Sequence, residues 1–79
     1  MDLVATEQRE FMSHWGQLID GNPTWRTGQS MFNALYHIRP DLADRLRGGE
    51  LDPFYRDHND GEAISNTLSW LEQHWEDPS

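Results

Sequence analysis

Two groups of residues in this 79-residue sequence contain side chains that could bind a metal ion: the histidines and a short polar segment. The four histidines are scattered, without an HExxH motif or a pair spaced i, i+4 that would give a zinc site. Their positions are His14, His37, His58 and His74. His14 and His74 would meet only if the first and last helices were neighbours. We therefore expect no metal site and no cofactor.

The segment RDHNDG, residues 56–61, has the composition of a calcium-binding loop. With Gly61 at the sixth position of such a loop, Arg56 takes the first position, which needs a carboxylate. Thr67 takes the twelfth position, which needs a bidentate Glu. The spacing therefore excludes this type of site. The sequence also contains no glycine-rich phosphate loop and no nucleophile set apart by its neighbours, so we expect a non-enzymatic protein.

A polar stripe is the most distinctive arrangement in the sequence. Arg26, Gln29, Asn33 and His37 follow one another at i, i+3, i+7 and i+11, which places them on one side of a helix. Such side chains on a helix followed by a turn resemble a DNA-reading helix. Alternatively, Gln29 and Asn33 hydrogen-bond the loops 39–41 and 48–53, or the stripe contacts a protein. Tyr55 and Trp70 are further candidate partner-binding residues.

The charge of the chain weighs against DNA binding. Fourteen Asp and Glu stand against six Arg, Lys is absent, and the net charge is −8. A surface this acidic repels nucleic-acid backbones and anionic membranes and favours a partner protein with a basic surface. The alternative is that the acidity only keeps a small protein soluble. Without Cys, the composition suits a reducing cytoplasm, and the N-terminal residues resemble neither a signal peptide nor a membrane span. We expect a cytoplasmic protein.

Hydrophobic periodicity predicts an all-α fold, as one small single-domain bundle over residues 1–79. Three main helices are expected at about 5–20, 25–38 and 61–76, with a short helix at 40–47. A turn at 52–56, within an irregular Pro/Gly loop, should present Phe54 or Tyr55 as an anchor. The apolar side of the second helix, expected to be buried, contains Trp25, Gly28, Met31, Phe32, Leu35 and Tyr36.

Gly28 is unusual because an interior glycine costs a helix about 1 kcal/mol relative to Ala. Close approach of another backbone or of a ring, such as Trp15 or Trp75, would explain it. A later start of the helix would explain it equally well. Trp70 lies off the apolar line of the last helix, so it is either a second core contact or an exposed anchor.

The middle of the chain resembles a group of small proteins of bacterial and phage genomes that has no assigned activity. The motifs that carry the resemblance are Trp25-Arg26-x-Gly28-Gln29, Phe32-Asn33-x-Leu35-Tyr36, Arg39-Pro40-Asp41-Leu42-Ala43, Arg47-Gly48 and Leu51-Asp52-Pro53-Phe54-Tyr55. The resemblance implies only a context, in which small acidic phage proteins bind and inhibit host proteins.

Three functions follow as hypotheses. The first is an acidic protein-binding module, such as a phage-encoded inhibitor of a host nucleic-acid-processing or defence protein. The second is a structural or assembly adaptor that forms a homodimer through exposed aromatics, including Tyr55 and Trp70. The third is a helix-turn-helix regulator that reads DNA with Arg26, Gln29 and Asn33.

Overall fold

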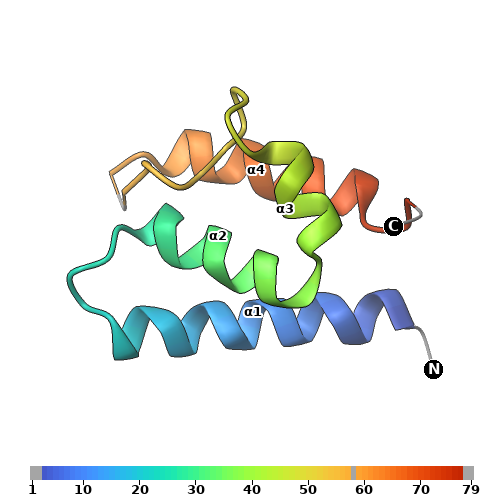
Figure 1. The fold of residues 1–79 in the computed structure, drawn as a ribbon, viewed down its shortest axis with the longest axis horizontal. Helices are drawn as coiled ribbons and strands as arrows, with labels where there is room; N and C mark the ends of the chain where they lie inside the picture. Colours follow the sequence, from blue (N-terminus) through green and yellow to red (C-terminus); the bar gives the residue numbers. More distant parts are fainter. Residues whose placement is uncertain (1–2, 58, 78–79) are drawn as a thin grey trace.

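The computed structural model describes residues 3–57 and 59–77, and within these ranges the chain is all-helical. It has four helices in the order α1 (Leu3–Gly21), α2 (Thr27–Ile38), α3 (Pro40–Leu46) and α4 (Gly61–His74). Figure 1 shows α1 and α2 side by side and running in opposite directions, with α3 and α4 beyond α2. The predicted all-α class is confirmed, and the four helices correspond approximately to the three main helices and one short helix that were predicted. His58 lies outside the described residues.

The helix α1 forms because apolar residues recur at helical spacing along one of its sides. Phe11 and Trp15 from that side are buried, and their rings stack with centroids 6.0 Å apart. Asn22 follows the helix, and both its backbone N–H and its side-chain amide donate to the Leu18 carbonyl, at 3.0 and 3.1 Å. These two bonds satisfy a carbonyl that the end of the helix leaves without a partner.

The helix α2 begins at Thr27, two residues later than predicted. Gly28 is therefore its second residue, and its N–H donates to the Arg56 carbonyl at 2.8 Å. A Cβ at this position would lie 1.8 Å from the Pro53 carbonyl oxygen. Both explanations offered for Gly28 therefore hold, but the approaching group is loop backbone and not the ring of Trp15 or Trp75.

The helix α3 follows α2 after one residue, Arg39. Pro40 suits the first position of this helix because its missing N–H needs no partner there. The side chains of Leu42 and Leu46 from this helix are buried. The helix ends before Gly48, which has a positive φ of 77°. That left-handed conformation favours glycine.

The loop between α3 and α4 is fastened at several points. Asp52 accepts hydrogen bonds from the N–H of Gly48 at 2.8 Å and of Phe54 at 3.0 Å. The expected turn is present, since the Arg56 N–H donates to the Pro53 carbonyl at 2.9 Å. The loop is attached to α4 through Thr67, whose buried hydroxyl donates to the Leu51 carbonyl at 2.7 Å.

The helix α4 ends at His74, two residues earlier than predicted. Its residues Ile64 and Leu71 are buried, as is Trp75 just beyond its end. They join one core with residues of the other three helices: Phe11, Trp15, Met31, Phe32, Ala34, Leu35, Leu42, Ala43 and Leu46. Among the described residues, the helices fall short of the length and apolar character that crossing a membrane requires.

Candidate functional site

A continuous run of ring contacts crosses the surface formed by α2, the residue after α3 and the following loop. We call it the arginine-tyrosine face, and its members are Arg26, Phe32, Tyr36, Arg47, Phe54 and Tyr55. Two of these rings are open to solvent: the Tyr55 residue is 74% exposed and Tyr36 is 48% exposed. Phe32 is buried and Phe54 half-buried, so the face joins exposed rings to the core.

Arg47 occupies one end of this face. Its guanidinium carbon lies 5.7 Å from the centre of the Phe32 ring and 5.5 Å from the centre of the Tyr36 ring. Cation–π contacts at exposed positions stabilise by about 0.5–1 kcal/mol each. Arg47 also forms an exposed ion pair of 3.3 Å with Asp44. These contacts place the Arg47 guanidinium over the Tyr36 ring.

Tyr55 and Arg26 occupy the other end. Phe54 meets Phe32 edge-on, with centroids 5.8 Å apart at 83°, and Tyr55 meets Phe54 at 5.1 Å. The Arg26 guanidinium carbon lies 6.0 Å from the centre of the Tyr55 ring. Phe54 is thus the anchor expected for the loop, and Tyr55 is the ring that it presents.

The members of the predicted polar stripe on α2 have different contacts within the chain. The Gln29 side-chain oxygen accepts from the backbone N–H of Arg26 at 3.3 Å, so it caps its own helix and does not brace the loops 39–41 and 48–53. Asn33 is half-buried. His37 is exposed, and its ring centre lies 4.6 Å from that of His14. Arg26 is the one member of the stripe that belongs to the arginine-tyrosine face.

Trp70 proves to be a core contact more than an exposed anchor. It is half-buried and packs against the core. The Arg45 guanidinium carbon lies 4.9 Å from its ring centre, and the His74 ring centre lies 4.6 Å away. His74 therefore neighbours Trp70, while His14 neighbours His37, so His14 and His74 contact different residues.

Tyr36 was predicted to be buried with the apolar side of α2, and this prediction was wrong because the residue is exposed. Tyr36 lies at the edge of the apolar side, where Arg47 covers one face of its ring. Arg47 is eleven residues further along and reaches Tyr36 only because α3 folds back. Helical spacing contains no signal for such a contact. Trp25, also expected to be buried, is half-buried.

Arg39 was not predicted to be a site residue, yet its side chain forms four hydrogen bonds. Its buried side chain forms a fork to Asp41, through Nε at 2.9 Å and Nη2 at 2.8 Å. Nη1 donates to the Trp75 carbonyl at 2.6 Å, and Nη2 to the Asp77 carbonyl at 3.1 Å. Arg39 therefore fastens the residues after α4 to the α2–α3 junction.

Hydrogen bonds from neighbouring cationic side chains shift the pKa values of two carboxyl groups, Asp41 and Asp77. The hydrogen bonds from Arg39, and then its charge, lower the pKa of Asp41 against the opposing effect of burial. The pKa of Asp77 is also lowered, by hydrogen bonds from Arg45 and His74. Both shifts favour the charged carboxylate, which suits structural ion pairs. A group of three or more metal-ligating side chains does not occur within 3–57 and 59–77.

Comparisons of the chain with protein-family models, curated proteins and solved structures gave no match. The assignment of the candidate site therefore rests on the geometry of the chain itself. That geometry consists of two exposed tyrosines, each beside a guanidinium, held by rings that reach the core.

Proposed function

We propose that this chain is a single-domain helical bundle that acts as a non-enzymatic protein-binding module through its arginine-tyrosine face. The observation that carries the proposal is the pairing of exposed Tyr55 with Arg26 and of exposed Tyr36 with Arg47. Tyr and Arg are enriched among the residues that dominate the energy of protein interfaces. This face concentrates both types on one surface.

The arrangement also lowers the entropic cost of binding. Immobilising a side chain at an interface costs about 0.5–1.5 kcal/mol, and side chains that are already ordered avoid part of that cost. Tyr55 is held by Phe54 and Arg26, while Arg47 holds Tyr36. The partner surface that fits would offer aromatic or aliphatic contact to the two rings and hydrogen-bond acceptors to the guanidiniums.

The test is affinity capture from a lysate of the source cells, with quantitative mass spectrometry. The tagged protein is compared with the double variant Tyr36→Ala, Tyr55→Ala and with the control Gln17→Ala, Gln73→Ala, which changes exposed residues of α1 and α4 outside the face. Hot-spot truncations cost about 2 kcal/mol or more, so the tyrosine variant should capture the partner at least about tenfold less. Equal capture by all three proteins would refute the proposal.

Homodimerisation through the same face is a second candidate, favoured by the 74% exposure of Tyr55. The net charge of −8 on each copy opposes it, and the repulsion weakens as salt is added. Sedimentation of the native chain and of the tyrosine double variant at low and high salt separates the candidates. A salt-promoted dimer that the double variant cannot form would support an adaptor.

A further inference from the structure

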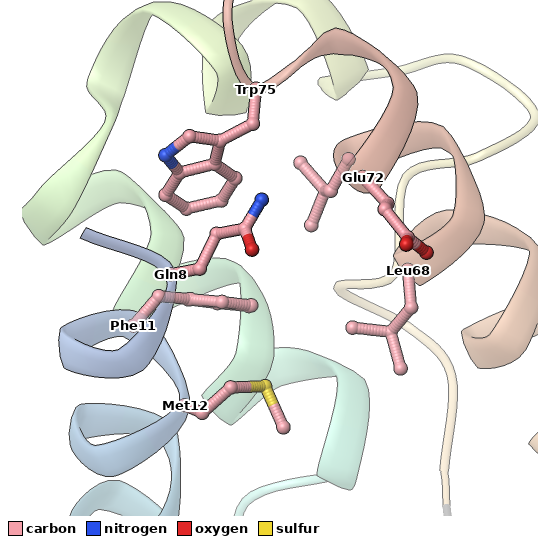
Figure 2. A pocket seen from close by; sticks show the side chains of 7 residues that line it. Gln8, Phe11, Met12, Leu68, Glu72 and Trp75 are labelled. Carbon is pink, nitrogen blue, oxygen red and sulfur yellow. The ribbon is translucent and has the colours of Figure 1, made fainter. Parts of the chain in front are cut away.

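A groove between α1 and α4 lies outside the arginine-tyrosine face. Its lining comes from Gln8, Phe11 and Met12 on α1 and from Leu68, Leu71 and Glu72 on α4. Figure 2 shows the Met12 and Phe11 side chains extending from α1 toward Leu68 on α4, with Trp75 at one end. The groove is therefore apolar around Met12, Phe11 and Leu68, while the Gln8 amide lies between Phe11 and Trp75, and Glu72 adds a carboxylate on the α4 side.

The groove is large enough for a side chain of another molecule. Its volume is about 180 Å³, and an apolar cavity of about 150 Å³ accepts benzene. Met12 is 51% exposed although it borders this apolar space. A large aliphatic or aromatic side chain seated here would remove the exposed Met12 surface from water.

Beyond the groove, α1 has further exposed positions on the side that contains Met12. Met12, Gly16 and Ile19 follow at i, i+4 and i+7, which places them on one side of the helix. Ile19 is 42% exposed. Gly16 is also exposed, and a Cβ there would meet nothing within 4 Å. The chain's own packing gives no reason for this helix-weakening residue, whereas a second helix lying against α1 would approach most closely at a glycine.

Charge selects the kind of helix that fits. Glu72 lines the groove, and Glu76, two residues beyond the end of α4, is exposed. The chain has a net charge of −8 and contains no Lys. A second copy of the chain would bring another −8 to the same place, which disfavours self-association. A helix flanked by Lys and Arg would instead be attracted.

We infer that the groove between α1 and α4 binds an amphipathic helix of a partner protein, with its apolar ridge between Met12 and Leu68 and basic residues beside Glu72 and Glu76. This is the helix-in-groove mode, in which residues at i, i+3 or i+4 and i+7 enter the apolar space. The inference concerns a second surface and does not depend on the arginine-tyrosine face.

The test uses three synthetic helical peptides of about 18 residues. The first has Leu at i, i+3 or i+4 spacing and Lys elsewhere, the second has Glu in place of Lys, and the third has the first composition with its Leu positions scrambled. By isothermal titration calorimetry, the first should bind at least tenfold more tightly than either of the others. Equal binding of the scrambled peptide would show attraction by charge alone and would overturn the inference.

The location of binding is tested separately by backbone amide NMR. Titration with the first peptide should shift the amide signals of α1 and α4 around Met12 and Leu68. Shifts confined to Tyr36 and Tyr55 would overturn the groove as the site while leaving the arginine-tyrosine face intact. Met12→Ser, a change at a half-exposed position that leaves the core unchanged, should weaken binding several-fold, and unchanged affinity would count against the groove.

Charge-matched variants test the basic flanks. Glu72→Gln with Glu76→Gln is compared with Glu10→Gln and Glu50→Gln, which remove the same charge elsewhere. Glu10 is two residues from Gln8 and so about 200° around α1, and Glu50 lies in the loop before α4. The first pair should weaken binding several-fold more than the second, with the difference shrinking in high salt. Equal effects of the two pairs would show that the basic residues of the helix do not lie beside Glu72 and Glu76, and this would refute the inference.

Discussion

Two helical glycines, Gly28 in α2 and Gly16 in α1, lie in opposite surroundings. At Gly28 the backbone of the following loop occupies the space that a side chain would need, and the Gly28 N–H bonds to the Arg56 carbonyl. At Gly16 the same space is open. The comparison shows that one region is closed by the chain's own backbone, while the other is left accessible. The region around Gly28 is part of the packed fold, whereas the surface at Gly16 is open to contact by another molecule.

The largest expected effect follows from closing the Gly28 site. Gly28→Ala would place a Cβ 1.8 Å from the Pro53 carbonyl oxygen and 2.8 Å from the Arg56 carbonyl oxygen. Both neighbours are backbone, so the loop must move and the bond to Arg56 is lost. We expect a loss of about 3 kcal/mol in the free energy of unfolding, because overpacking costs about 1–3 kcal/mol and a hydrogen bond is lost in addition. Urea denaturation measures it.

The same experiment has a second readout. Tyr55 belongs to the loop that Gly28 holds, so movement of this loop should separate Arg26 from Tyr55. Amide signals of residues 53–56 should therefore shift in any Gly28→Ala protein that still folds. A variant with native stability and unshifted loop signals would contradict the account of Gly28 given by the structure.

The next effect concerns the Arg39 fork. Asp41→Asn removes the carboxylate that receives two Arg39 hydrogen bonds. Bonds to charged groups contribute about 1.5–3 kcal/mol. Because the Asp41 side chain is 23% exposed, we expect the free energy of unfolding to fall by about 1–2 kcal/mol near pH 7. The Asp41→Glu variant is the control, because it keeps the negative charge at this position but changes the geometry of the two hydrogen bonds from Arg39.

The sign of the pH dependence follows from the lowered pKa of Asp41. Its ordinary value is 3.8, and the Arg39 hydrogen bonds bring it below that in the folded chain. The stabilisation is therefore complete well above 3.8 and is lost as pH falls through the lowered folded value. The gap between wild type and Asp41→Asn in urea denaturation should be constant above about pH 5 and close as the solution is acidified. A gap that widened toward low pH would contradict this assignment.

Local patterns predicted the helices because hydrophobic periodicity depends on residues that are close together in the sequence. The loop contacts were not predictable in the same way. Gly28 was recognised as unusual, but its neighbour comes from more than twenty residues further along the chain. The bonds from Arg39 to the residues after α4 were missed because their acceptors are the backbone carbonyls of Trp75 and Asp77, and every residue has such a carbonyl, so the sequence contains no signal for them.

The polar stripe shows the same limit for the candidate site. Its members share a helix face, yet Arg26 lies over Tyr55, Gln29 bonds to the Arg26 backbone and His37 lies beside His14. Spacing fixes which side chains share a face, whereas the packing of other elements decides what each one contacts. For this reason Arg26 and Tyr55 were identified separately, while their contact and the contribution of Tyr36 and Arg47 were not.

The smallest effect, and the one opposite in sign, is expected at Gly16. Gly16→Ala adds a methyl group to open space and should raise the free energy of unfolding by about 0.5–1 kcal/mol, because Ala restricts the unfolded chain more than Gly does. Urea denaturation measures this gain, and calorimetry with the Lys-containing amphipathic peptide measures binding to the same variant. A helix seated on α1 would lose its closest approach at the new methyl group, so the variant should be more stable and yet bind the peptide several-fold more weakly.

Gly21→Ala, also in open space but at the end of α1, is the matched control for stability. A destabilised Gly16→Ala protein would show that this side of α1 is packed more closely than the structure has it, and unchanged peptide binding would remove Gly16 from the proposed contact.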